Sequence, residues 1–301
     1  MHFADHLAEL VRQKQTPLCV GLDPRWESLP QLIRTKHADG TLRGVAHAFE
    51  DFCLTVLELV APHVGVVKPQ SAFFEAAGHE GMKAQQQVIA RAKELGLSVI
   101  LDAKRGDIAS TATAYADASF DGTELDGRRL PVWNADSLTV NPYLGRDAIE
   151  PFIQTARRDA RGLFVLVRTS NPGSGLFQNL VSEKKPLYRH VADAVVQWNA
   201  ENLGECGLGD IGAVVGATHP KELVELREAM PTVWFLVPGY GAQGGSAADV
   251  APAFLENGLG ALVNSSRGIT FPFKPNEANW KDKILEATLR SAKELKEVAK
   301  L

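Results

Sequence analysis

The chain has 301 residues, of which 45% are hydrophobic and 23% charged, and this composition is typical of a globular protein with a full core. The formal net charge of −4 argues against nucleic acid or an anionic membrane as the main partner. No apolar run reaches membrane-spanning length, and the three cysteines are too widely spaced to indicate a disulfide framework or a zinc site. The first residues have no basic start and no apolar signal segment, so we expect a cytoplasmic protein.

Strand-like and helix-like segments alternate along the chain. Eight short apolar runs predict buried strands at 17–23, 63–68, 97–104, 137–141, 162–169, 210–217, 232–238 and 259–264. Between and around them, apolar residues three and four apart predict helices at 4–13, 46–59, 82–95, 146–160, 187–203, 220–229 and 278–299. This alternation predicts an α/β protein with a parallel sheet. Eight units of this kind indicate a single (β/α)8 barrel domain over residues 1–301, with strands at about 17–264 and an extra N-terminal helix.

Three longer segments, 24–44, 120–136 and 170–186, separate some of these elements, and loops of this length often shape a site or an interface. In a (β/α)8 barrel the active residues lie at the carboxyl ends of the strands and in the loops that follow. Polar residues stand at these ends in five of the predicted strands: Asp23, Lys68, Asp102 with Lys104, Asn141 and Ser170. Several strand ends that carry polar groups into one mouth indicate a site.

Asp102 and Lys104 end an apolar strand, and alternation along that strand places both side chains on the same side. Two opposite charges at this position are costly unless they pair or act on a ligand. Asp107 follows in the turn, where it can extend an alternating array of carboxylates and ammonium groups. Taken alone, a pair of this kind is more often a structural salt bridge at a strand end, and it is the rest of the chain that favours a site.

The segment 239–245 matches the Gly-x-Gly-x-x-Gly pattern, but its position does not fit a dinucleotide site. That pattern belongs after the first strand of a doubly wound sheet, with an acidic residue about twenty positions on. Here it follows the seventh predicted strand, and no acid stands in the corresponding downstream region. The loops after strands seven and eight of a barrel commonly bind phosphate, and Ser266 and Arg267 follow strand eight. We therefore expect a phosphate site, although the glycines alone also fit a tight turn.

With these motifs the chain resembles the orotidine 5′-phosphate decarboxylase family. The segment 102–111 is similar to the family's Asp-x-Lys-x-x-Asp signature, an element that related sugar-phosphate barrels share. Further similar segments occur in family order over residues 17–270, at 21–24, 67–69, 169–173, 238–245 and 266–267. The lengthened loops and the Thr-Ser-Asn-Pro-Gly segment resemble the longer bacterial branch, often called type 2. Shorter members lack the insertion at 24–26, so the geometry of the lid and of a dimer rim does not follow from the resemblance.

The resemblance implies a role for each matching residue. Lys104 would donate a proton to the pyrimidine carbon that loses carbon dioxide, with Asp102, Asp107 and Lys68 completing the charge array. Asp107, Ile108 and Thr111 would reach into a neighbouring subunit's site, which implies a homodimer with shared sites. The remaining substrate contacts implied by the family are Asp23 and Lys68 to the ribose, Ser170 to the pyrimidine, and Gln243, Arg267 and the backbone at Ser266 to the phosphate. Pro238 is a further expected substrate contact. The implied substrate is the nucleotide orotidine 5′-phosphate, the product is UMP, and neither a cofactor nor a metal is required.

Two other functions remain open from the sequence. A metal-dependent sugar-phosphate lyase of the same barrel superfamily would need an acidic metal ligand near the end of strand two, where this chain has Lys68. A noncatalytic sensor of nucleotide phosphates would keep the 239–245 loop and Arg267 but would have no need of Lys104.

Overall fold

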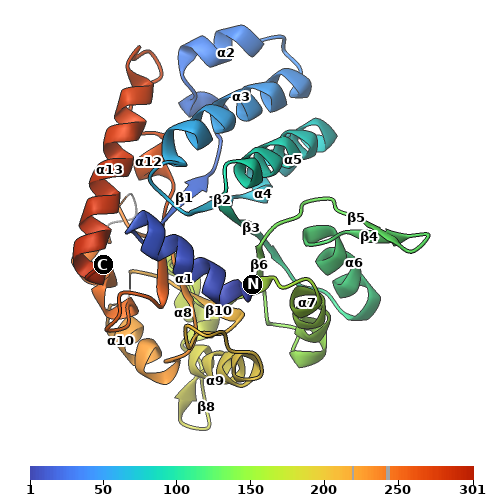
Figure 1. Cartoon of the computed structure of the whole chain (residues 1–301), viewed down its shortest axis with the longest axis vertical. Helices are drawn as coiled ribbons and strands as arrows, with labels where there is room; N and C mark the ends of the chain where they lie inside the picture. Colours follow the sequence, from blue (N-terminus) through green and yellow to red (C-terminus); the bar gives the residue numbers. More distant parts are fainter. Residues whose placement is uncertain (219, 242–244) are drawn as a thin grey trace.

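The computed structural model describes residues 1–218, 220–241 and 245–301. Eight parallel strands close into a barrel in the order β1-β12-β11-β10-β7-β6-β3-β2, and helices surround it (Figure 1). The predicted α/β barrel is therefore confirmed. The barrel strands are β1 (Leu18–Leu22), β2 (Val66–Pro69), β3 (Ser98–Arg105), β6 (Ser137–Val140), β7 (Gly162–Arg168), β10 (Ile211–Val215), β11 (Phe235–Val237) and β12 (Ala261–Ser265).

All seven helices expected from the sequence are present. The longer helices are α1 (Phe3–Lys14), α3 (Leu42–Val60), α5 (Gly78–Glu94), α6 (Ala109–Ser119), α7 (Arg146–Arg158), α9 (Leu187–Ala200), α10 (Pro220–Ala229) and α13 (Trp280–Ala299). The hydrophobic pattern did not predict α6, because its sequence is mostly Ala, Ser and Thr and carries no apolar stripe. The short helices are α2 (Gln31–His37), α4 (Ser71–Glu75), α8 (Gly175–Gln178), α11 (Ala247–Val250) and α12 (Arg267–Thr270).

The predicted N-terminal helix, α1, covers the amino-terminal end of the barrel, where Figure 1 shows it crossing in front of the strands. Its buried residues Phe3, Leu7 and Val11 belong to the same apolar cluster as Phe164 and Trp234 of the barrel. The rings of Phe3 and Phe164 meet edge to face, with centroids 6.3 Å apart. This packing closes one end of the barrel and leaves the carboxyl end for a site.

Side chains alternate along β3 between the barrel interior and the surrounding helices. Val99 and Leu101 belong to the core shared with the helices, whereas Ile100 belongs to the interior cluster. Asp102, two residues after Ile100, therefore points into the barrel at its carboxyl end. The alternation expected of a buried barrel strand is what brings this carboxylate to the mouth.

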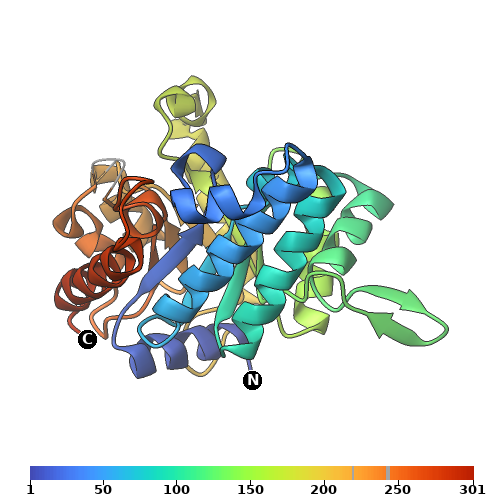
Figure 2. The ribbon, with the colours of Figure 1, turned by 90° about the horizontal axis from the view of Figure 1, so that it is seen from above.

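The three long segments contain small elements of their own. Segment 24–44 holds a 3-10 turn at Trp26–Ser28 and α2, and segment 120–136 forms a hairpin of β4 (Thr123–Leu125) and β5 (Arg128–Leu130). Segment 170–186 holds a 3-10 turn at Pro172–Ser174, then α8 and a hairpin of β8 (Val181–Ser182) and β9 (Lys185–Pro186). The β4–β5 hairpin extends away from the barrel in both views (Figures 1 and 2). Among the described helices, none is both long enough and apolar enough to span a membrane.

Candidate active site

A cavity of about 480 Å³ opens at the carboxyl ends of the barrel strands. Its volume is within the range typical of small-molecule sites, roughly 300–1,000 Å³. Most of the predicted site residues line it: Asp23, Lys68, Asp102, Lys104, Ser170, Pro238, Ser266 and Arg267. Residues that the sequence reasoning did not assign to the site also line it, including Arg25, Gln70, Thr139, Asn171, Tyr240 and Asn264.

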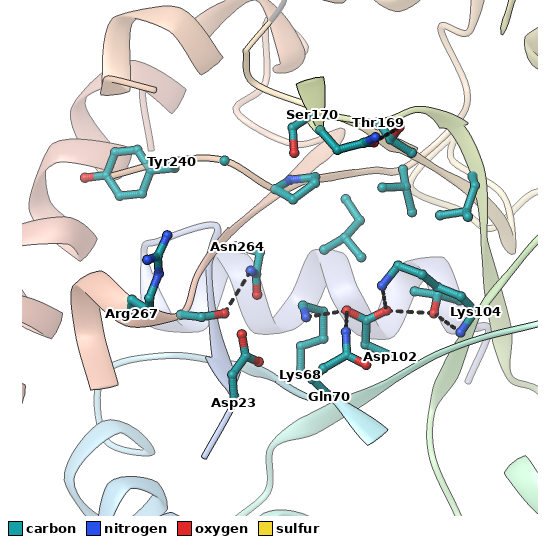
Figure 3. A pocket seen from close by; sticks show the side chains of 18 of the residues that line it. Asp23, Lys68, Gln70, Asp102, Lys104, Thr169, Ser170, Tyr240, Asn264 and Arg267 are labelled. Carbon is teal, nitrogen blue, oxygen red and sulfur yellow. Dashed lines mark hydrogen bonds and ion pairs between the residues drawn. The ribbon is translucent and has the colours of Figure 1, made fainter. Parts of the chain in front are cut away.

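Asp102 is the centre of the charged part of the cavity (Figure 3). One carboxylate oxygen, Oδ2, accepts from Lys68 Nζ at 2.6 Å and from Gln70 Nε2 at 2.9 Å. The other, Oδ1, accepts from Lys104 Nζ at 2.6 Å and from Thr139 Oγ1 at 2.9 Å. Four donors therefore satisfy this almost fully buried carboxylate, two of them cationic, which offsets the cost of its burial.

The two central charges stabilise each other as ions. Burial alone would raise the pKa of Asp102, but Lys68 and Lys104 hold that pKa well below its usual range. Burial alone would lower the pKa of Lys68, but the carboxylates of Asp102 and Asp23 raise it above its usual range. Asp102 is therefore a carboxylate and Lys68 an ammonium group throughout the neutral pH range.

Lys104 differs from Lys68 in exposure and in backbone conformation. Its side chain is 45% exposed and that of Lys68 only 6%, so the Lys104 ammonium is the more accessible of the two to a ligand. Its φ of 48° lies in the left-handed region, which costs a residue with a side chain about 1–3 kcal/mol. The register of β3 with β6 also shifts between Leu101 and Arg105. Asp102 and Lys104 meet as predicted. Their contact depends on this backbone kink at Lys104 as well as on the alternation of side chains along β3.

Two residues that line the cavity each carry a buried acceptor that is unused. Asp23 Oδ1 and Asn264 Oδ1 have no hydrogen-bond partner in the described part of the chain. Buried polar atoms are nearly always paired in folded proteins, so an unpaired acceptor on a residue that lines a cavity is a candidate partner for a ligand's donor. Hydroxyl groups, such as those of a sugar, are donors of this kind.

Arg267 lies at the end of the cavity opposite Lys104 (Figure 3), and the preceding residue, Ser266, also lines the cavity. A side chain at Gly21 would bring its Cβ within 1.9 Å of Ser266 Oγ, so only glycine allows β1 to lie this close to the loop after β12. The guanidinium of Arg267 is exposed and forms neither a hydrogen bond nor an ion pair with any described residue. An unpaired guanidinium next to a hydroxyl suits an anionic group such as phosphate.

The glycine-rich loop supplies another wall through Pro238, Gly239 and Tyr240. Gly239 and Gly241 have φ values of 103° and 75°, which explains the glycines at these two positions. Gln243, expected at the phosphate, lies outside the described residues.

Segment 170–186 fixes a further wall, which carries Thr169 and Ser170. Gln178 of α8 accepts the backbone N–H of Thr169 at 3.0 Å and donates to Thr169 Oγ1 at 2.7 Å. The neighbouring Arg168 is 2% exposed and pairs with Glu222 of α10 at 3.3 Å. Part of this long segment thus holds the wall of the cavity in place.

Asp107, Ile108 and Thr111 do not line the cavity of their own chain. Asp107 accepts the backbone N–H of Ile108 at 2.8 Å, and Ile108 is 55% exposed. Asn141 does not line the cavity either, and its Oδ1 accepts the N–H of Tyr143 at 3.1 Å. Within one chain, the array therefore contains Asp102, Lys68 and Lys104 but not Asp107.

A closed parallel barrel with a charged cavity at its carboxyl end defines a (β/α)8-barrel enzyme. The sequence profile described as "Orotidine 5'-phosphate decarboxylase / HUMPS family" matches residues 16–279. The chain therefore belongs to this family, and it is a carbon–carbon lyase.

Individual relatives agree with this assignment. A protein of Rhodopirellula baltica named orotidine 5′-phosphate decarboxylase is 48% identical over 98% of this chain and 99% of its own length. One of the same name from Deinococcus radiodurans is 42% identical over 89% of each chain. A crystal structure of a putative orotidine-monophosphate decarboxylase from Toxoplasma gondii is 32% identical, has a TM-score of 0.82, and aligns over 99% of this chain and 97% of its own.

Proposed function

We propose that this chain decarboxylates orotidine 5′-phosphate to UMP in pyrimidine biosynthesis, without a cofactor, and that Lys104 donates the proton. The observation that carries the proposal is the array of Lys68, Asp102 and Lys104 facing a cavity whose other end presents Arg267. Names of full-length relatives support the substrate.

The array suits the chemistry of this reaction. When the bond between the pyrimidine ring carbon and the carboxylate breaks, carbon dioxide leaves and the electron pair stays on the ring carbon. The Lys104 ammonium stabilises this charge as it develops and then transfers a proton to the same carbon. Asp102 keeps that ammonium charged and directed, since their atoms are 2.6 Å apart.

The cavity offers a place for each part of the nucleotide. In our proposal the phosphate lies between Ser266 and Arg267, and the ribose hydroxyls donate to the unpaired Asp23 oxygen near Lys68. The pyrimidine ring then lies between Ser170 and Lys104, with its carboxylate near Asp102. Binding energy at the remote phosphate can be used to orient the ring at the reacting carbon.

The decisive assay follows the loss of orotidine 5′-phosphate absorbance in EDTA. We expect turnover that the chelator does not reduce. Activity on a sugar phosphate that requires a divalent metal would instead indicate the lyase alternative. Tight UMP binding without turnover would indicate the sensor.

We also propose a homodimer in which Asp107, Ile108 and Thr111 complete the partner's site. These residues lie outside their own cavity, and an apolar side chain, Ile108, is exposed among them. In our proposal the partner subunit covers this exposed side chain.

Mixed dimers test this shared site. Lys104→Ala and Asp107→Ala chains with different tags are each expected to be inactive, and subunit exchange should restore activity. One site of a mixed dimer carries both lesions and the other carries none, so up to about half the native activity per dimer returns. Purified heterodimers without recovered activity would place Asp107 in its own subunit's function.

The location in the cytoplasm is part of the same proposal. All three cysteines are free, which fits a reducing compartment.

A further inference from the structure

Thr139 on β6 joins the two residues on which the proposed chemistry depends. Its hydroxyl donates to Asp102 Oδ1 at 2.9 Å and accepts the backbone N–H of Lys104, also at 2.9 Å. Thr139 is 1% exposed, so in the folded chain water does not compete with either bond. A hydroxyl can donate only one hydrogen bond, and that of Thr139 donates it to Asp102.

The backbone of Lys104 needs such a support. Its left-handed φ of 48° is unfavourable for lysine, and conformations of this kind persist only where the surroundings fix them. Lys104 is also where the regular register between β3 and β6 is interrupted. The bond from the Lys104 N–H to Thr139 spans that interruption and fixes the start of the lysine side chain.

We propose that Thr139 is a positioning residue for the decarboxylation: one hydroxyl fixes the Asp102 carboxylate and the Lys104 backbone together, and so sets where the ammonium meets the reacting carbon. This inference rests on the proposed function. Thr139 acts through Lys104 and Asp102 and is not a proton donor to the substrate. Its effect is therefore on kcat rather than on nucleotide affinity.

The test compares Thr139→Val, Thr139→Ser and Ser137→Ala with the wild type. Valine keeps the β-branched shape and deletes both bonds, whereas serine keeps the hydroxyl. Ser137 is a matched control, because it lies two residues earlier on the same strand, is fully buried, and its Oγ has no partner among the residues described. For each variant, kcat, KM, UMP affinity and the melting temperature are measured.

We expect Thr139→Val to lower kcat about tenfold to a hundredfold, because an error of about 1 Å in a catalytic group costs about that much. Its UMP affinity should stay within about threefold of wild type, and both Thr139→Ser and Ser137→Ala should retain most of the wild-type kcat. A Thr139→Val kcat within threefold of wild type would overturn the proposal. So would a Thr139→Ser variant as slow as the valine variant, or a loss confined to KM.

Kinetics of the wild type, together with a crystal structure of Thr139→Val, distinguish a failure of this inference from a failure of the proposed function. If the wild type decarboxylates orotidine 5′-phosphate and Thr139→Val is equally fast, only the inference fails. If the wild type itself is inactive, the proposed function fails, and the position of Lys104 in Thr139→Val still tests the inference. An unchanged Lys104 backbone and ammonium position in that variant would overturn it. If Thr139→Val does not fold, Thr139→Ala is used in the same comparison.

Discussion

Asp136 and Asp102 are buried carboxylates at opposite ends of the barrel, and of the two only Asp102 lines the cavity at the carboxyl ends of the strands. At the amino-terminal end, Asp136 pairs with Lys93 and Arg161 and accepts the N–H of Val99. At the carboxyl end, Asp102 is satisfied just as fully by Lys68, Gln70, Lys104 and Thr139. A buried ion pair is therefore not by itself evidence of a site.

The two ends differ in what surrounds the ion pairs: apolar packing at one end and an open cavity at the other. At the amino-terminal end, α1 packs over the barrel with Phe3 and Leu7. At the carboxyl end, an open cavity is lined by the unpaired Asp23 oxygen and by the guanidinium of Arg267. Unused hydrogen-bonding capacity on residues that line a cavity is what identifies the functional end.

The largest effect is expected from Lys104→Ala, which removes the accessible ammonium of the array. Turnover should fall by at least about 10³-fold, since positioned proton transfer contributes 10²–10⁴-fold and charge stabilisation adds to it. The melting temperature should fall only slightly, because the Lys104 side chain is 45% exposed and Asp102 keeps its bonds to Lys68, Gln70 and Thr139. Steady-state kinetics and thermal unfolding measure both quantities, with the exposed Lys83 of α5 changed to Ala as a control. A variant with near-native kcat would show that the proton donor is another group.

At the amino-terminal end we expect a loss of stability without a loss of turnover. Asp136→Asn removes the charge that Lys93 and Arg161 share, and should lower the free energy of unfolding by about 3 kcal/mol, as breaking a buried pair does. The kcat of the folded protein should not change, because the pair lies outside the cavity. Urea unfolding and activity below the melting range test this.

Glu58→Gln is the control for that prediction. Glu58 pairs with Arg91 on the surface, where such pairs contribute at most about 1 kcal/mol. If the Asp136 variant lost no more stability than the Glu58 control, the buried Asp136 pair would not be a stabilising feature of the amino-terminal end.

Arg267→Ala should have a smaller effect, confined to ligands with a phosphate. A charge-assisted hydrogen bond is worth about 1.5–3 kcal/mol, so UMP affinity should fall about tenfold to a hundredfold. The affinity for uridine, which lacks the phosphate, should not change. Calorimetric titration with both ligands measures the difference, and Arg43→Ala, an exposed arginine outside the cavity, is the control. An equal loss for UMP and uridine would remove Arg267 from the phosphate site.

The smallest effect is a pH dependence of stability. The pKa of Asp102 is lower in the folded chain than in the unfolded chain. The charge of Asp102 therefore contributes fully to the free energy of unfolding above the unfolded-state pKa of about 4, and this contribution is lost as the pH falls toward the folded-state pKa. The difference in unfolding free energy between the wild type and Asp102→Asn should therefore shrink by about 1 kcal/mol from pH 5 to pH 3. Urea unfolding at both pH values measures it. A difference that stays constant would mean that Asp102 is not held as an ion by Lys68 and Lys104.

Local patterns in the sequence were sufficient for the barrel and for much of the site. Eight apolar runs and the helical periodicity between them predicted the strands, and the polar residues that end those strands predicted Asp23, Lys68, Asp102 and Lys104 at one mouth. These predictions succeed because a period of two or 3.6 residues is a property of a single segment, and because parallel strands in a barrel all end on the same side.

The tertiary structure decided what depends on neighbouring segments. Thr139 looks like an ordinary strand residue, and only the pairing of β3 with β6 brings its hydroxyl to Asp102 and Lys104. Likewise, Gln70 donates to Asp102 on a neighbouring strand, and Gln178 donates to Thr169, nine residues earlier in the chain. A hydrogen bond between elements depends on register, twist and backbone kinks such as that at Lys104, and no periodicity within one segment encodes these. The sequence by itself determined which charges reach the mouth of the barrel, and the packing of strands against one another determined how they are held there.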